Sequence, residues 1–125
     1  MNECVLIVDD EPDIMRILSY VLNEAGFRVI PAYGAEDAMR KVKLHKIDLI
    51  LTDLAMPKVS GVEIIQQVKG DPQTKHIPVI AVTAHTWEGL AQSAGEAGCD
   101  GFIPKPFNNR QLVLDVRKFL KASKP

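Results

Sequence analysis

The sequence has few cysteines, no surplus of either charge and no long apolar run. Its two cysteines, Cys4 and Cys99, stand far apart without a CxxC motif, which argues against a disulfide framework or a cysteine metal site and favours buried thiols. A net charge of −1 offers no polybasic face for nucleic acid. Because no apolar run approaches ~18 residues and no signal peptide opens the chain, we expect a cytoplasmic protein that binds neither membranes nor nucleic acid.

Internal repeats and low-complexity segments are absent as well. A chain of 125 residues is long enough for one ordinary domain and too short for two of average size. With 46% apolar and 25% charged residues, its composition is that of a folded globular protein. We expect a single domain over residues 1–125, with a core from about 4 to 120 and a short polar tail over 121–125.

Short β-prone runs alternate with helical patterns along the whole chain. The runs predict strands at 5–8, 27–30, 47–52, 78–82 and 101–104. Apolar residues at helical spacing predict helices from about 12 to 26, 35–44, 62–68, 87–97 and about 112–120. Near-continuous apolar strands separated by helices indicate a parallel sheet covered on both faces, which is the doubly wound α/β class.

Polar residues follow most of the predicted strands. Asp9 and Asp10 follow the first strand, Asp53 the third, Thr83 the fourth and Lys105 the fifth. The carboxyl ends of parallel strands meet at one edge of the sheet, where ligands bind in this class of fold. We therefore expect these five residues to gather at that edge.

Three acids in one crevice require positive charge nearby. Carboxylates about 5 Å apart repel by roughly 3 kcal/mol per pair at an effective dielectric near 20, and Lys105 alone does not neutralise three of them. A hard divalent cation with oxygen ligands does, and Mg²⁺ favours one or two carboxylates together with waters and a phosphate oxygen. The sequence thus predicts a magnesium site at this edge.

Each acid also has a purely structural interpretation. Glu11 and Asp13 lie in the first turn of a predicted helix, where acids complement the helix dipole, so we assign them no function. Asp10 alone would serve as a helix N-cap, and Asp53 alone as a turn residue. Since a cap needs one carboxylate, the adjoining pair of Asp9 and Asp10 favours a function.

Four segments in this order resemble the receiver domain of two-component response regulators: VLIVDDEPD, LILTDLAMPKVSG, IPVIAVTA and GFIPKPF. The resemblance runs from about Cys4 to Leu120, and its specificity comes from the ordered set at the strand ends rather than from any single motif. It implies the flavodoxin-like (CheY-like) fold, a five-stranded parallel sheet in the order 2-1-3-4-5. It also implies a phosphoacceptor of a phosphorelay signal transduction system, not an enzyme with turnover.

The resemblance implies how the phosphoryl group would be held. Asp53 would be the phosphoacceptor, and Thr83 and Lys105 would grip phosphoryl oxygens. Phe102 falls at the switch-aromatic position of the family, whose rotamer follows Thr83. The bond between Lys105 and Pro106 would be cis, which proline permits because it lowers the cis penalty.

A metal site is implied in the same way. Mg²⁺, with Mn²⁺ as a substitute, would be bound directly by Asp10, by Asp53 and by the backbone carbonyl of Ala55. Asp9 would act mainly through a bound water.

The resemblance also implies partners. The phosphodonor would be a histidine kinase or a histidine phosphotransfer protein, docking at Ile14, Ile17, Pro106 and Phe107. Of the two isoleucines, we expect Ile17 in the core and Ile14 exposed, because Ile17 lies in the apolar stripe of its helix. Output would pass from the fourth and fifth strands and their helices to a downstream effector protein or a further output domain, with the receiver a monomer or a phosphorylation-dependent homodimer.

Three other functions stay open at this point. An aspartyl-phosphate phosphatase needs a second acid two residues after its nucleophile, which Asp53-Leu54-Ala55 lacks. A flavodoxin-like cofactor-binding protein needs a phosphate-cradling loop in place of DDEPD. A phosphorylation-independent interaction module would share the receiver fold, and the presence of all five polar strand-end residues argues against it.

Overall fold

The computed structural model describes residues 3–54, 61–83 and 88–123 of the chain, in which strands and helices alternate. The strands are β1 (Cys4–Val8), β2 (Arg28–Ala32), β3 (Leu49–Thr52), β4 (Val79–Thr83) and β5 (Gly101–Pro104). The helices are α1 (Pro12–Glu24), α2 (Ala35–Leu44), α3 (Gly61–Gly70), α4 (Glu88–Glu96) and α5 (Asn109–Ser123). Within the described ranges, no helix combines the length and the apolar character needed to cross a membrane.

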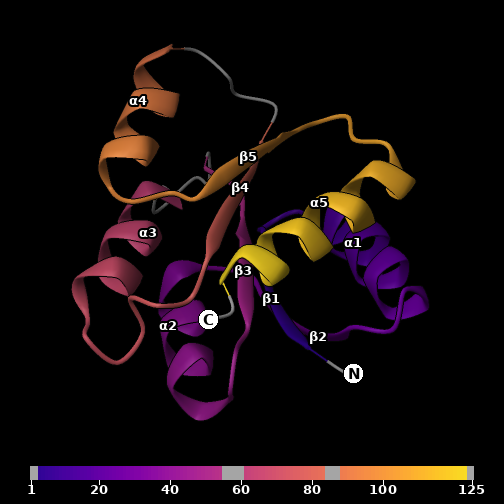
Figure 1. Cartoon of the computed structure of the whole chain (residues 1–125), viewed down its shortest axis with the longest axis horizontal. Helices are drawn as coiled ribbons and strands as arrows, with labels where there is room; N and C mark the ends of the chain where they lie inside the picture. Colours follow the sequence, from indigo (N-terminus) through magenta and orange to yellow (C-terminus); the bar gives the residue numbers. More distant parts are fainter. Residues whose placement is uncertain (1–2, 55–60, 84–87, 124–125) are drawn as a thin grey trace.

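All five strands form one parallel sheet in the order β2-β1-β3-β4-β5. Helices α1 and α5 cover one face of this sheet, while α2, α3 and α4 cover the other (Figure 1). The predicted fold class and strand order are therefore confirmed. The order reverses between β1 and β3, because the chain first turns outward to β2 and then returns past β1 to build the rest of the sheet.

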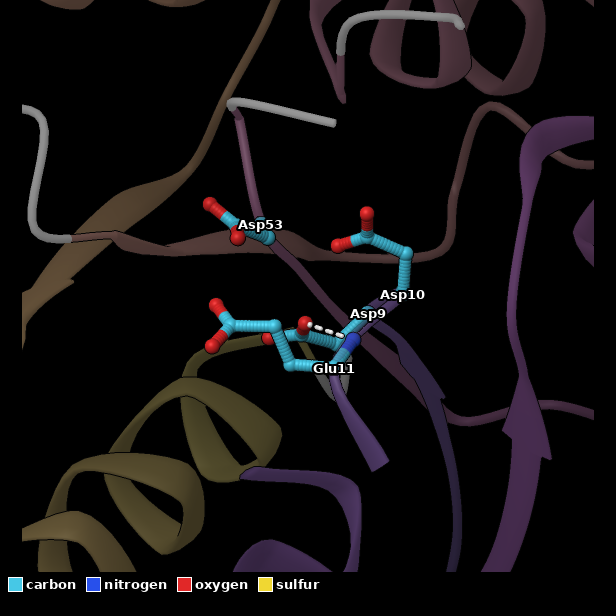
Figure 2. Close-up of side chains that lie close together, drawn as sticks. All are labelled: Asp9, Asp10, Glu11 and Asp53. Carbon is cyan, nitrogen blue, oxygen red and sulfur yellow. Dashed lines mark hydrogen bonds between the residues drawn. The ribbon is translucent and has the colours of Figure 1, made fainter. Parts of the chain in front are cut away.

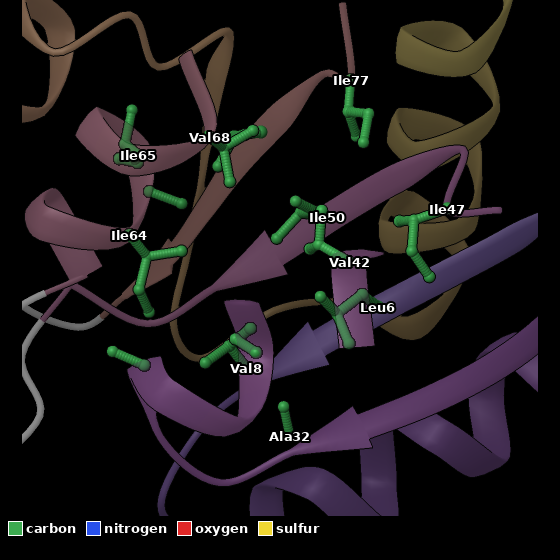
Figure 3. Close-up of a cluster of buried hydrophobic side chains, with 14 of the residues drawn as sticks. Leu6, Val8, Ala32, Val42, Ile47, Ile50, Ile64, Ile65, Val68 and Ile77 are labelled. Atoms are coloured by element: carbon green, nitrogen blue, oxygen red, sulfur yellow. The ribbon is translucent and has the colours of Figure 1, made fainter. Parts of the chain in front are cut away.

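The central strands contribute to both hydrophobic cores. Along β1, Leu6 and Val8 point into the core under α2, α3 and α4, whereas Val5 and Ile7 point into the core under α1 and α5. Figure 3 shows the first of these cores, in which side chains from the sheet meet Ile64 and other residues of α3. Burial on both faces explains why the strand is continuously apolar.

Helix α1 uses a different set of residues for its buried face than the sequence predicts. Met15, Leu18 and Leu22 are buried, whereas Ile17 is 45% exposed and Ile14 is half-buried against the core. The expectation that Ile17 lies in the core and Ile14 is exposed is therefore wrong. The buried face is centred one residue further along the helix, so Ile17 falls on the solvent side of the stripe.

Two aspartates begin strand pairing at the amino edge of the sheet. The Asp48 amide donates to the Cys4 carbonyl, and its Oδ2 accepts from the Cys4 amide, each over 2.8 Å. Asp100 makes the same pair of 2.8 Å bonds with Val79. Each aspartate thus satisfies a strand's first amide with its side chain, which explains why β3 begins at Leu49 rather than at the predicted residue 47.

Both edge strands contain a proline. Pro31 lies within β2, and Pro104 ends β5. Proline has no amide hydrogen and is tolerated in a sheet at edge positions, where no ladder bond is lost. The carbonyl of Pro31 accepts a hydrogen bond from Nζ of Lys41 in α2.

Both cysteines are free thiols. Cys4 is buried, as the sequence predicts, while Cys99 is only half-buried and donates from Sγ to the Gly101 carbonyl over 3.1 Å. Burial raises the pKa of both thiols above the usual range. Both side chains are accordingly in the protonated, weakly nucleophilic form at neutral pH.

Candidate functional site

The polar residues predicted to share one sheet edge do come together, at the point where the strand order reverses. Asp9 and Asp53 directly follow β1 and β3, which are neighbours in the sheet, with Val8 in register with Thr52. The Asp53 amide donates to the Val8 carbonyl over 3.0 Å. This bond fixes the backbone of Asp53 beside the end of β1.

Four acids form the floor and rim of this site. Asp9, Asp10, Glu11 and Asp53 each offer a carboxylate oxygen, and these oxygens lie within 4.8 Å of one another (Figure 2). Asp9 and Asp53 are 1% and 5% exposed, Asp10 is half-buried and Glu11 is exposed. The acids therefore range from a buried pair to a solvent-facing rim.

Lys105 reaches this cluster from the loop after β5. Its Nζ lies 3.0 Å from Oδ2 of Asp9 and 3.3 Å from Oδ2 of Asp53, and its side chain is 11% exposed. Burial by itself would lower the pKa of Lys105, but the hydrogen bond to Asp9 and the charges of Asp9 and Asp53 raise the pKa above its ordinary value. The ammonium is thus held charged between two carboxylates.

The two aspartates after β1 are placed differently. Oδ1 of Asp9 accepts from the Glu11 amide over 2.9 Å, and Oδ2 accepts from Lys105, so both of its oxygens have protein partners. Asp10 receives no hydrogen bond from the part of the chain that the structure describes. The alternative role of Asp10 as the N-cap of α1 is wrong, because Glu11 occupies that position.

The remaining strand-end residues lie at the same edge. Thr83 ends β4 and is 2% exposed, and its carbonyl accepts from the Lys105 amide over 3.1 Å. Phe102 on β5 is 44% exposed. The peptide bond between Lys105 and Pro106 is cis, as expected.

Two further expectations concern Ala55 and the residues expected to dock a partner. Ala55, expected to offer its carbonyl to a metal, lies outside the described residues. Of the expected docking residues, Ile17 and Pro106 are exposed, whereas Ile14 and Phe107 are half-buried.

Gly61 is part of the site although the sequence marks it only as a loop residue. A Cβ at this position would lie 2.1 Å from the Asp53 carbonyl oxygen and 2.9 Å from Cα of Leu54. The Gly61 amide donates to the Leu54 carbonyl over 3.0 Å. Only glycine lets α3 start this close to the end of β3. The one feature of the sequence that could have indicated this role is a glycine directly before a predicted helix.

The donor set fits a hard divalent cation. Four carboxylates around one ammonium leave a surplus of negative charge, and each carboxylate offers oxygen, the ligand atom that Mg²⁺ prefers. Such a cation would supply charge neutralisation at oxygens bound beside Asp53. Both oxygens of Asp9 already have protein partners, and Oδ2 of Asp53 accepts from Lys105.

Comparisons with known proteins agree with this geometry. A family model described as the response regulator receiver domain matches residues 5–117. The chain is 35% identical over 123 residues to the alkaline phosphatase synthesis transcriptional regulatory protein PhoP of Bacillus subtilis, covering 98% of this chain and 50% of the relative. It is 32% identical over 120 residues to the polar-differentiation response regulator DivK of Brucella anthropi, covering 96% of this chain and 98% of the relative. The chain thus spans half the length of the first relative and nearly all of the second.

A solved structure resembles the fold as well. The response regulator protein TrrA from Thermotoga maritima, in complex with Mg(2+)-BeF, matches with a TM-score of 0.82 and 30% sequence identity, over 93% of this chain and 97% of that one.

Proposed function

Because this chain belongs to the response regulator receiver domain family, we propose that Asp53 is the residue on which it accepts a phosphoryl group. The chain is a receiver of a two-component system, a signalling phosphoacceptor rather than an enzyme with turnover. The observation that carries the proposal is the placing of Asp53, which is 5% exposed, beside a buried ammonium and among three further acids. We take residues 1–125 as one receiver domain.

The chain's own residues would position the transfer. Asp53 would attack phosphorus in line with the leaving group, as a carboxylate nucleophile does. Lys105, already 3.3 Å from Asp53, would move its hydrogen bond to a phosphoryl oxygen and offset the added charge. Thr83, at the end of β4 and bonded through its carbonyl to the Lys105 amide, would hold a second phosphoryl oxygen.

The acidic cluster is typical of the metal site of this family. We propose that the ion is Mg²⁺, with Mn²⁺ as a substitute, held by Asp10, Asp53 and the carbonyl of Ala55. The likeness to the complex of TrrA with Mg(2+)-BeF supports this assignment. The two protein partners of Asp9 favour its acting on the ion through a water.

The output would be a change at the surface of β4, β5, α4 and α5. Phe102 would report the state of the site, because it lies on β5 in register with Ala81, two residues before Thr83. Its exposed ring, 44% accessible, has room to change rotamer. A downstream effector protein, or a further output domain, would read that change.

The family implies a histidine kinase as partner. We propose that this kinase or a histidine phosphotransfer protein docks at α1 and the loop after β5, through the exposed Ile17 and Pro106 with Ile14 and Phe107 beside them. We assign the exchange to the cytoplasm, a reducing compartment that suits two free thiols. The receiver would work as a monomer or as a phosphorylation-dependent homodimer.

Intact-mass measurement after incubation with acetyl phosphate and MgCl₂ tests the proposal. Wild type is expected to gain one phosphoryl group, lost with a chelator and in Asp53→Ala. Asp71→Asn, a change of an acid in the loop after α3, is the matched control and should label normally. Stoichiometric labelling of Asp53→Ala contradicts the proposal, and no labelling of wild type favours a phosphorylation-independent interaction module.

A further inference from the structure

Glu11 is placed at the site in a way that its position in the chain does not explain. It is the N-cap residue of α1, yet its side chain makes no capping hydrogen bond to the helix. A side chain at an N-cap ordinarily accepts from a free amide of the first turn. Here the carboxylate turns away from the helix, and Figure 2 shows it on the same side as the carboxylate of Asp53.

Two contacts, one of the backbone and one of the side chain, join Glu11 to residues of the site. Its own amide donates to Oδ1 of Asp9 over 2.9 Å, which ties the backbone of Glu11 to the buried acid. Its Oε1 lies 3.9 Å from Nζ of Lys105, which makes Glu11 the third anionic neighbour of that ammonium. With 61% of its side chain exposed, Glu11 is on the solvent-facing rim of the acidic cluster, whereas the side chain of Lys105 is only 11% exposed.

We propose that Glu11 is a positioning residue for phosphoryl transfer, which sets the charge at the entrance of the site and provides Lys105 with an alternative partner to Asp53. The inference rests on the function proposed above and deepens it. A negative charge here strengthens the binding of a divalent cation to the acidic cluster. The same charge opposes the approach of an anionic phosphodonor and draws Lys105 away from the oxygens that the donor brings.

The step it acts on is a simple displacement. With acetyl phosphate, a carboxylate oxygen of Asp53 forms a bond to phosphorus while the bond from phosphorus to the bridging oxygen breaks. The bonding electrons leave with acetate, no proton is transferred, and the total charge of reactants and products is the same. Glu11 forms no bond in this step.

Glu11→Gln is expected to change two measured quantities in opposite directions. Magnesium affinity of the unphosphorylated protein, measured by calorimetric titration, should fall by about threefold or more, because one neighbouring charge is lost at a partly screened site. At saturating magnesium, the second-order rate of phosphorylation by acetyl phosphate should rise by about threefold or more for the same reason. Both differences should shrink as the salt concentration is raised.

Asp13→Asn is the matched control. Asp13 also lies in the first turn of α1 and is 85% exposed, but it pairs with Arg16 and is not part of the acidic cluster. It carries the same interaction with the helix dipole. Both quantities should stay within about twofold of wild type, since the charge removed is remote from the site and screened.

A loss or gain of both quantities together in Glu11→Gln overturns the inference, because a purely structural role would weaken binding and rate alike. Unchanged values, or an equal change in Asp13→Asn, overturn it too. Labelling of wild type distinguishes failure of the proposed function from failure of the role of Glu11. If wild type accepts no phosphoryl group, the proposed function is wrong. If wild type is labelled but Glu11→Gln does not change magnesium affinity and phosphorylation rate in opposite directions, only the role of Glu11 is wrong.

Discussion

At the scale of single residues, Lys105 stabilises two buried acids, Asp9 and Asp53, whose negative charges would otherwise repel each other. Its ammonium contacts Asp9 and Asp53, and these contacts raise the pKa of Lys105 above its ordinary value of 10.5. A raised folded-state pKa gives stability that is fully present below the unfolded pKa and is lost as pH rises through the folded one. Lys105 therefore stabilises the protein at neutral pH and stops doing so in strong alkali.

Lys105→Met tests this dependence in metal-free buffer. We expect its free energy of unfolding at pH 7 to lie about 2–3 kcal/mol below wild type, because the acids lose their counter-charge. The deficit should stay level to about pH 10 and shrink above it. Urea denaturation across this range measures it, with Lys43→Met as an exposed control. A deficit that grows with alkalinity would contradict the prediction.

Gly61 links the backbone of α3 to the phosphoacceptor strand. Gly61→Ala forces a shift of the Asp53 carbonyl, since the added carbon would lie 2.1 Å from that oxygen. We expect a loss of about 1–3 kcal/mol in unfolding free energy and slower phosphorylation, because the strain falls on Asp53 itself. Gly70→Ala, at the other end of α3 with nothing within 4 Å of the added carbon, should be neutral or stabilising. Equal behaviour of the two variants would contradict this reading.

The part of the site that follows from strand ends was predictable, and the part that depends on contacts was not. Asp9, Asp53 and Lys105 stand directly after apolar strands, and a parallel sheet must bring such positions together. Glu11 and Gly61 carry no such signal. From the sequence alone Glu11 is assigned no function, because the pattern of a helix start does not show which way the side chain turns.

At the scale of elements, the periodicity of α1 identified a helix but not its buried face. Met15, Leu18 and Leu22 share their turns with Ile14 and Ile17, so two adjacent apolar stripes fit the same 3.6-residue period. Packing against the sheet decides between them, and it leaves Ile17 exposed. The bounds of α2, in contrast, agree with the sequence, because apolar and charged residues separate cleanly there.

The aspartates at the amino edge offer a test of how strands are aligned. Asp48→Ala removes the acceptor of the Cys4 amide, and we expect a loss of about 1 kcal/mol in unfolding free energy, a typical value for one hydrogen bond. Asp48→Asn keeps a side-chain oxygen and should retain most of the stability. Urea denaturation of both variants measures the difference. A larger loss in Asp48→Asn than in Asp48→Ala would contradict the role of the acceptor.

At the scale of the whole molecule, the site joins distant parts of the chain. Lys105 bonds to Asp9 across 96 positions and to Asp53 across 52. A ligand bound here recognises the complete fold and not any local segment. Binding must therefore stabilise the chain as a unit.

Thermal unfolding with and without MgCl₂ tests this coupling. At about ten times its Kd, the ion should add about 1.4 kcal/mol to the free energy of unfolding of wild type. Asp10→Asn should be more stable than wild type without the ion, because one repelling charge is gone, and should gain little from it. NaCl at matched ionic strength is the control. An equal gain from magnesium in Asp10→Asn would contradict the assignment of Asp10 as a ligand.

The strand order agrees with the one that the resemblance to receiver domains implies, although the pattern of a single strand does not indicate whether it is an edge strand. The borders become visible only in three dimensions, where Arg28 on β2 and Phe102 on β5 are exposed while the central strands are covered on both faces. Handedness of the crossovers limits the arrangement, and packing completes it.

The prolines at those borders affect how copies of this chain meet at high concentration. An open sheet edge is a template onto which another backbone can add as a further strand. On β2, Pro31 has no amide hydrogen to offer such a strand, and its carbonyl is already occupied by Lys41. Pro104 likewise withholds a donor on β5. Strand addition, the route to domain swapping and fibrils, is therefore disfavoured at both borders, which leaves side-chain contacts as the favoured way for copies of this chain to meet.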